Sequence, residues 1–168
     1  MTKIGLLSDT HSFLDKKVFE HFKDCDEIWH AGDIGDIDVA DQLENFKKFR
    51  AVNGNIDDKT VKAVYPNDLF FEVEGLSVFI THIGGYPGRY TARVKEILQK
   101  KKPGLYICGH SHILKVMRDK KLDVLHLNPG AVGHHGFHVM RTLLRFDIEE
   151  RRPKNLEAIE LGKRGKID

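Results

Sequence analysis

Five short polar motifs, each directly after an apolar run, constrain the fold of this sequence more than any other feature. They are Asp9-x-His11, Gly32-Asp33, Gly54-Asn55, Thr81-His82 and Gly109-His110-x-His112. Any one of these short patterns arises often by chance, but five in succession after strand-like runs do not. In open α/β sheets, ligands bind outside the carboxyl ends of the strands, where loops from different strands converge. The motifs therefore predict one shared site at the ends of several strands.

The first third of the chain alternates between strand and helix patterns. Short apolar runs predict strands over residues 4–7, 27–30 and 49–52, and apolar residues at helical spacing predict a helix over residues 18–25. Asp36 is the predicted cap of a second helix, with Val39, Leu43 and Phe46 on one face. Such alternation is typical of parallel strands joined by right-handed crossovers.

The remainder of the chain changes character. Two runs, 69–73 and 76–80, flank Glu74-Gly75 and predict a hairpin, and a helix is expected over 90–100. A buried strand at 105–108 and mostly antiparallel strands at 116–117, 124–127, 142–148 and 156–161 complete the pattern. We therefore expect an α/β fold with two packed mixed β-sheets, a sandwich flanked by α-helices, in one domain spanning residues 1–168.

Composition limits the classes of partner. The 27 Lys and Arg against 25 Asp and Glu give a net charge of +2, too small for a field that would attract a nucleic-acid polymer. Two cysteines are too few for a disulfide framework, and neither a secretory leader nor a membrane-spanning apolar run is present. We expect a cytoplasmic protein with no membrane partner, and the sequence leaves its oligomeric state open.

The residue types in the motifs indicate metal binding. Asp9 and His11 are two residues apart, so a nearly extended backbone would point both side chains to the same side, and His110 and His112 repeat that spacing. A glycine before Asp33, before Asn55 and before His110 would let the main chain turn and approach the metals closely.

Charge counting extends this interpretation. Two divalent ions bring four positive charges, and Asp9 and Asp33 offset two, so the site stays electropositive. Water bound there should ionise at a pKa of about 7, and a phosphate anion should be attracted. Mixed nitrogen and oxygen ligands suit Mn, Fe, Ni, Co or Zn better than Mg or Ca. The lack of cysteine among the candidate ligands disfavours a structural zinc site.

Taken together, these residues resemble the calcineurin-like metallophosphoesterases, most closely their small stand-alone phosphodiesterase branch. The resemblance runs from Asp9 through Asn128-Pro129-Gly130. It implies two transition-metal ions, with manganese the first expectation. The implied ligands of the first metal are Asp9, His11, Asp33 and His112, and those of the second are Asp33, Asn55, His82 and His110.

The resemblance also implies a reaction. Asp33 would bridge the metals, held about 3.5–4 Å apart, and a hydroxide shared between them would attack phosphorus in line. The expected substrate is a small phosphodiester or phosphomonoester. Asp33, Asn55 and His82 would act in catalysis through that hydroxide.

Three departures distinguish the chain from the family pattern. Ile56 follows the Asn ligand where many relatives carry a His that helps to protonate the leaving group. Ala131 follows Asn128-Pro129-Gly130 where relatives usually continue with Ser and soon present an Arg, and here a glycine- and histidine-rich segment, 133–138, comes next. Thr81 precedes His82 where a Gly is usual.

Other polar residues have weaker assignments. His30 is predicted to orient Asp33 rather than to bind metal directly, and Asp57 is a second candidate for that supporting role. His134, His135 and His138 could replace the missing Arg in substrate binding, although an exposed loop is the simpler interpretation. Arg89 could reach the rim of the site, with a plain turn as the alternative. His21 is expected on a helix surface and His126 within a strand.

One alternative function belongs to a different class. A non-catalytic binding module, like the retromer scaffold subunit of the same fold, resembles these enzymes but lacks some of the metal-binding histidines. This chain retains every expected ligand, so the enzyme is favoured, and metal content would separate the two. A nuclease is a weaker third option, because no basic groove for a polymer is evident.

Overall fold

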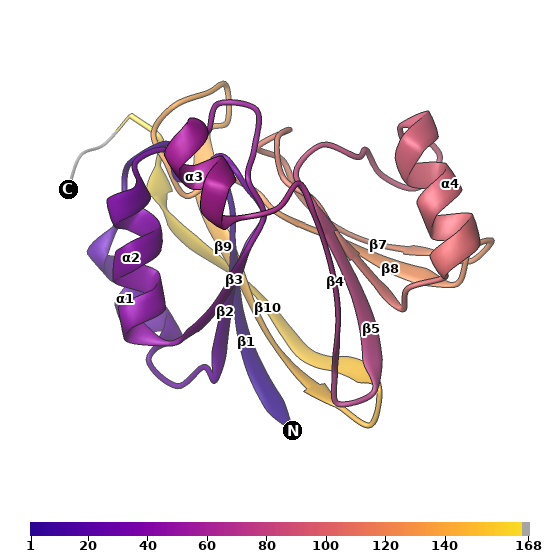
Figure 1. Cartoon of the computed structure of the whole chain (residues 1–168). Helices are drawn as coiled ribbons and strands as arrows, with labels where there is room; N and C mark the ends of the chain where they lie inside the picture. The colour runs from indigo at the N-terminus through magenta and orange to yellow at the C-terminus, as the bar shows by residue number, and fades with distance from the viewer. Residues whose placement is uncertain (166–168) are drawn as a thin grey trace.

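The strands of this protein form two five-stranded mixed sheets that face each other (Figure 1). A computed structural model describes residues 1–165. The first sheet has the order β10-β9-β1-β2-β3, with bounds Arg152–Lys163, Met140–Glu149, Thr2–Leu7, Glu27–His30 and Lys48–Ala51. The second has the order β4-β5-β6-β8-β7, with bounds Asp68–Val73, Leu76–Thr81, Leu105–Ile107, Val124–Pro129 and Leu114–Asp119. The predicted fold class is confirmed.

Each sheet contains three neighbouring parallel strands and two antiparallel strands. β1 pairs in parallel with β2, and β2 with β3, whereas β9 and β10 join antiparallel. In the second sheet β5, β6 and β8 are parallel, and the edge strands β4 and β7 are antiparallel. The parallel strands of each sheet end on the same side, so the loops that follow them are neighbours.

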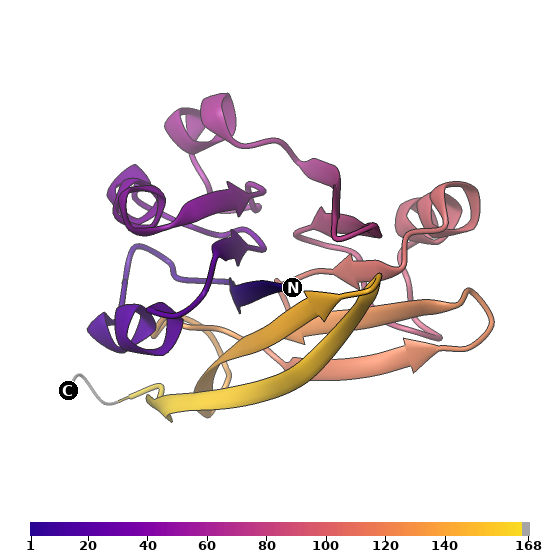
Figure 2. The ribbon, with the colours of Figure 1, turned by 90° about the horizontal axis from the view of Figure 1, so that it is seen from below.

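The helices cover the outer faces of the sandwich (Figures 1 and 2). α1 (Lys16–Phe22), α2 (Ile37–Phe46) and α3 (Lys59–Val64) lie on the side of the first sheet, and α4 (Ala92–Lys101) on the side of the second. Within residues 1–165 no helix has the length and apolar character needed to cross a membrane.

The core lies in three layers that follow from strand alternation. Ile4 and Leu6 of β1 point between the sheets, together with Trp29 and Ile107. Leu7 belongs instead to the layer under α1 and α2. A third layer joins α4 to the second sheet through Phe79, Val94, Leu98 and Tyr106. Because successive strand residues face opposite sides, these fully buried strands read as continuous apolar runs rather than as alternating patterns.

Most of the predicted elements are confirmed. Asp36 caps α2, and its carboxylate accepts a hydrogen bond from the Asp38 backbone N–H at 3.1 Å. The hairpin turns at Glu74-Gly75, where both residues have positive φ. His126 lies in β8 and His21 in α1.

Three helices differ from the prediction. α1 ends at Phe22, so Cys25 lies beyond it. α4 begins at Ala92 rather than at residue 90, because the Thr91 hydroxyl accepts from the Val94 N–H at 3.3 Å and caps the helix there. α3 was not predicted. It has six residues, of which only Val61 is buried, so no amphipathic pattern develops; its one signal is the cap, Asp58.

The buried ring of His126 predicts an acid-sensitive fold. Burial lowers its pKa from 6.5 to about 4, with Lys115 adding to the shift and a backbone hydrogen bond opposing it. Between these values only the unfolded chain takes up the proton, so stability falls as pH falls from about 6.5 to about 4, by about 3 kcal/mol in total. The His126→Phe variant keeps a ring against Tyr106 but removes the titration.

Urea unfolding of metal-free protein at about pH 7 and about pH 4.5 measures this effect. The His126→Phe variant should lose less stability on acidification than the wild type, and His21→Asn, on α1, should match the wild type. Equal acid-induced losses in the wild type and His126→Phe would contradict the assignment.

Candidate metal centre

The five motifs converge where the strands end. Asp9 and His11 follow β1, Asp33 follows β2, Asn55 follows β3, His82 follows β5, and His110 and His112 follow β6. Backbone hydrogen bonds tie these loops together, from Asp9 N to Gly32 O at 3.0 Å, from His11 N to Asp33 O at 3.1 Å and from Gly109 N to His82 O at 3.0 Å. The His110 N–H donates to Asp9 Oδ2 at 3.1 Å and so joins the loops of one sheet to those of the other.

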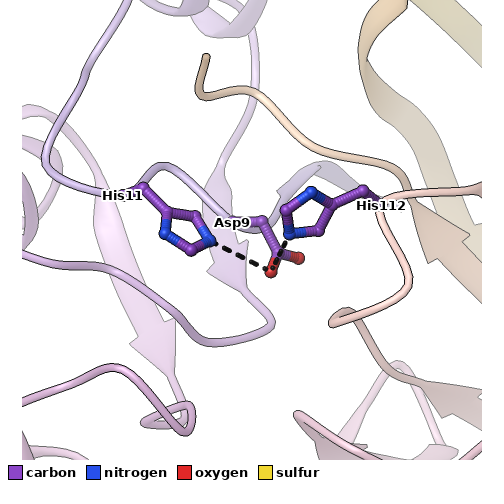
Figure 3. A group of neighbouring side chains, drawn as sticks. All are labelled: Asp9, His11 and His112. Atoms are coloured by element: carbon purple, nitrogen blue, oxygen red, sulfur yellow. Dashed lines mark ion pairs between the residues drawn. The ribbon is translucent and has the colours of Figure 1, made fainter. Parts of the chain in front are cut away.

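One group of potential ligands contains Asp9, His11 and His112, which come from two loops and point toward one another (Figure 3). The Nε2 atom of His112 lies 3.1 Å from Asp9 Oδ1, and that of His11 lies 3.8 Å from the same oxygen. One ligand atom from each of the three residues lies within 4.8 Å of the others, which is the spacing of atoms around a common ion.

A second group contains Asp33, His82 and His110. The Nε2 atom of His82 lies 3.2 Å from Asp33 Oδ2. Asn55, the remaining predicted ligand, places its side-chain oxygen 3.0 Å from His110 Nδ1. All seven predicted ligand residues therefore lie in or beside the two groups.

Asp33 connects the two groups. Its Oδ2 atom is 3.4 Å from His11 Nε2 in the first group and 3.2 Å from His82 Nε2 in the second. Its other oxygen, Oδ1, accepts a hydrogen bond from the Ile56 N–H at 3.0 Å, which fixes the carboxylate. This geometry suits a carboxylate shared by two ions.

Several atoms at the centre of the cluster are buried and lack a hydrogen-bond partner. They are Asp9 Oδ1, His11 Nε2 and His82 Nε2. Buried polar atoms without a partner are costly, and native structures contain few of them. Nitrogen and oxygen lone pairs that converge in this way are the donor set of a first-row transition metal, so the residues present fit two divalent ions.

The surrounding contacts prepare His82 as a ligand. Its Nδ1 atom lies 2.7 Å from the Ala31 carbonyl oxygen, which can only accept, so Nδ1 carries the proton and Nε2 presents its lone pair to Asp33. Burial lowers the pKa of His82, but the nearby carboxylates of Asp33 and Asp9 outweigh it, so in the absence of metal the pKa lies above its ordinary value.

Both carboxylates of the cluster are held ionised. Burial raises the pKa of each, yet the nearby rings of His11 and His112 beside Asp9, and of His82 beside Asp33, outweigh it and leave both pKa values below the ordinary range. Two divalent ions bound here by neutral imidazoles and these two carboxylates would keep a positive excess that can attract an anion.

The expectation of a nearly extended backbone at Asp9 and His11 was wrong. Their φ values are +53° and +45°, in the left-handed region. Asp33, His110 and His112 also have positive φ, at +55°, +68° and +60°. Non-glycine residues rarely adopt this conformation, and each costs on the order of 1–3 kcal/mol. The inter-loop hydrogen bonds hold these residues in place, and such strain clusters at functional sites.

The three motif glycines lie close against ligand side chains, and their approach to the metals stays a prediction. A Cβ on Gly54 would clash with the Asp33 carboxylate, and one on Gly109 would come within 2.7 Å of Asp9 Oδ2. Any side chain at these positions would push the loops away from the ligands.

His30 and Asp57 support the ligand loops without joining the cluster. The Nδ1 atom of His30 accepts from the Gly32 N–H at 3.1 Å, and its Nε2 lies 3.0 Å from the Thr10 hydroxyl. Burial lowers the pKa of His30 to about 3, so the ring is neutral. Asp57 accepts from the N–H groups of Gly35 and Gly54, both at 2.7 Å, and joins the Asp33 loop to the Asn55 loop.

The residues predicted to bind substrate lie in different surroundings. The His134 ring lies against Phe13 at a tilt of 60°, and its Nδ1 atom contacts the Arg164 carbonyl. His135 is exposed, with its ring centroid 4.9 Å from that of His11. Arg89 is exposed in a turn closed by its own N–H on the Tyr86 carbonyl at 2.8 Å. Of the three, only His135 is beside a potential ligand, and their roles stay predictions.

A polar cleft of about 380 Å³ opens beside the second group. Asn55 and His82 line it, as do two cationic side chains, Lys62 of α3 and Arg93 of α4. Arg93 is paired with Asp68 at 2.6 Å and hydrogen-bonded to Thr81. Sequence analysis did not single out Lys62 or Arg93, because each lies on a helix of the outer layer, far from the motifs in sequence.

The comparisons with known proteins agree with this geometry. The family model of the calcineurin-like phosphoesterase superfamily domain matches residues 2–151, and the chain belongs to that family. A probable metallophosphoesterase from Methanothermobacter thermautotrophicus is 32% identical over 133 residues, 76% of each chain.

Two solved structures illustrate the range of this fold. A structure reported as that of an archaeal phosphodiesterase is 27% identical, with a TM-score of 0.75 over 95% of this chain and 99% of that one. Vps29 of Chaetomium thermophilum has a TM-score of 0.74 over 97% of this chain and 100% of its own, at 15% identity, a similarity of fold alone.

Proposed function

We propose that this chain, acting as one domain, is a metal-dependent phosphodiesterase that uses a hydroxide shared by two metal ions for in-line attack on phosphorus. The observation that carries the proposal is the pair of ligand groups joined through Asp33, whose Oδ2 atom faces a histidine of each group at 3.4 and 3.2 Å. Two divalent ions held by these groups would supply a nucleophile at neutral pH and offset charge on the phosphoryl oxygens.

The protein residues would each perform a limited task. Asp9, His11, Asp33 and His112 would hold one ion, and Asp33, Asn55, His82 and His110 the other, with manganese the first candidate. Asp57 and His30 would keep the loops of Asp33 and Asn55 at a fixed separation through their backbone contacts. This preorganisation places the reacting groups without further movement of the chain.

A small diester is the favoured substrate. The cleft beside Asn55 and His82 has room for one ester substituent outside the metal cluster. The Lys62 side chain on its wall favours an anionic ligand, because the charge of Arg93 is already paired with Asp68. The archaeal phosphodiesterase of similar structure supports a diester over a monoester. A cytoplasmic location stays a prediction.

Removal of metal should abolish activity reversibly. We expect close to two transition-metal ions per chain. Chelation should stop hydrolysis of bis(p-nitrophenyl) phosphate, because the proposed nucleophile is a hydroxide that forms only with metal bound. Addition of Mn²⁺ or a similar ion should restore it. Elemental analysis and a metal-supplemented rate assay measure both. Protein that binds no metal and stays inactive with every added ion would refute the enzyme.

That outcome would favour the second candidate function, a non-catalytic scaffold of the same fold. The specific observation in its favour is the similarity of fold to Vps29. The unpartnered lone pairs of Asp9, His11 and His82 support the enzyme, because buried polar atoms without a partner are costly and two bound ions would satisfy them.

A further inference from the structure

The segment from Gly133 to His138 carries three histidines, and one of them contacts a proposed metal ligand directly. The Nδ1 atom of His138 lies 3.2 Å from the Nδ1 atom of His112, and the Nε2 atom of His138 lies 2.9 Å from the Gly133 carbonyl oxygen. The rings of His112 and His138 meet edge to face, with centroids 5.0 Å apart. His138 therefore bridges the ligand and the backbone of its own loop.

These contacts determine where the protons lie. A carbonyl oxygen only accepts, so His138 Nε2 must carry a proton and donate it to Gly133. The Nδ1 atom of neutral His138 then has a lone pair and accepts from His112 Nδ1–H. The remaining nitrogen of His112, Nε2, is left with its lone pair, and this atom lies 3.1 Å from Asp9 Oδ1 in the first ligand group.

We propose that His138 is a positioning residue, which holds His112 in the Nδ1-protonated tautomer and aims its Nε2 atom at the ion bound by Asp9 and His11. The inference rests on the proposed metal centre. Metal-binding histidines generally donate their other ring N–H to a fixed acceptor, and loss of that acceptor typically costs about 10- to 100-fold in metal affinity.

The loop that carries His138 is itself anchored to the site. The Gly133 N–H donates to the Asp9 carbonyl at 3.0 Å, and the Arg164 side chain donates to the His138 carbonyl at 2.9 Å. In His82 the proton is held on Nδ1 by a backbone carbonyl instead, that of Ala31. A carbonyl oxygen accepts in every state, whereas His138 Nδ1 accepts in only one tautomer. The bond from His138 Nε2 to Gly133 is therefore needed to select that tautomer.

Nitrogen NMR of the zinc-loaded wild type tests the tautomers directly, because Zn²⁺ is diamagnetic. In protein with ¹⁵N-labelled histidine we expect a proton on Nδ1 and zinc on Nε2 of His112, and a proton on Nε2 of His138. Zinc on Nδ1 of His112, or a proton on Nδ1 of His138, would overturn the proposal.

Two variants of similar size separate the acceptor from the ring. In His138→Asn the amide oxygen occupies the place of Nδ1, whereas His138→Leu fills the same space with no acceptor. In titrations of metal-free protein with Mn²⁺, the Leu variant should lose about 10- to 100-fold in the affinity of one site and retain the other, and the Asn variant should stay within a few-fold of the wild type. His21→Leu, on α1, should bind as the wild type does.

The outcomes distinguish this inference from the proposed function. A wild type that binds no metal contradicts the metal centre itself. A wild type with two ions and a Leu variant with unchanged affinities at both sites refutes only the role of His138. Equal losses in the Leu and Asn variants would also refute it, by showing that the ring matters for packing rather than as an acceptor. If circular dichroism shows that the Leu variant does not fold, the NMR of the wild type still decides.

Discussion

Asp33→Asn is expected to lose both metal ions and to lower diester hydrolysis more than about 100-fold, beyond the loss typical of residues that only support a ligand. Its Oδ2 atom faces a histidine of each ligand group at 3.4 and 3.2 Å, whereas Asp9 approaches the second group only at 3.9 Å from His82. The Asp33 carboxylate is also held by the Ile56 N–H. The amide keeps the shape but removes the negative charge that both ions would share. Metal content and the hydrolysis rate of an aryl diester measure the effect.

Two comparisons make the Asp33 prediction specific. Asp38→Asn makes the same change in charge on α2, away from the cluster, and should retain both ions and full activity. His30→Ala removes the contacts to Gly32 and Thr10 but no proposed ligand, so its loss should be about 10- to 100-fold. A His30→Ala variant as impaired as Asp33→Asn would show that our division between ligands and supporting residues is wrong.

The sequence predicted the order of the elements well because the core is built from strands buried on both faces. Runs such as residues 4–7 and 105–107 are apolar throughout, and buried parallel strands require that composition. α3 escaped prediction because a six-residue helix with one buried side chain is determined by its Asp58 cap and its tertiary contacts rather than by periodicity.

The convergence of the motifs also followed from the sequence, since parallel strands bring their carboxyl ends together. The conformation of the motifs did not. Local preference gives Asp9 and His11 an extended backbone, but hydrogen bonds to Gly32 and Asp33, distant in sequence, hold both in the left-handed region. The bond between His138 and His112 was likewise inaccessible, because it joins loops 26 residues apart that meet only through the packing of both sheets.

Ile56 distinguishes this chain from relatives that carry a histidine after the Asn ligand. The residue is 45% exposed, and its backbone N–H is bound to Asp33. Its backbone therefore lies beside the cluster, and its side chain has no proton to transfer. A positioned acid typically contributes about 10²- to 10⁴-fold to the departure of a poor leaving group. Without one at this position, the reaction should depend strongly on the acidity of the leaving group.

The rate of hydrolysis should therefore fall steeply as the pKa of the leaving group rises. Bis(p-nitrophenyl) phosphate should react readily and alkyl phosphomonoesters poorly. Ile56→His should flatten the slope of rate against leaving-group pKa by donating a proton to the departing oxygen, whereas Ile56→Leu should leave that slope unchanged. A series of aryl diesters measures it. A slope already shallow in the wild type would contradict the argument and indicate another proton donor. His135 would then be the first residue to replace, because it is exposed beside His11. The Nδ1 atoms of His134 and His138 are engaged in contacts of their own.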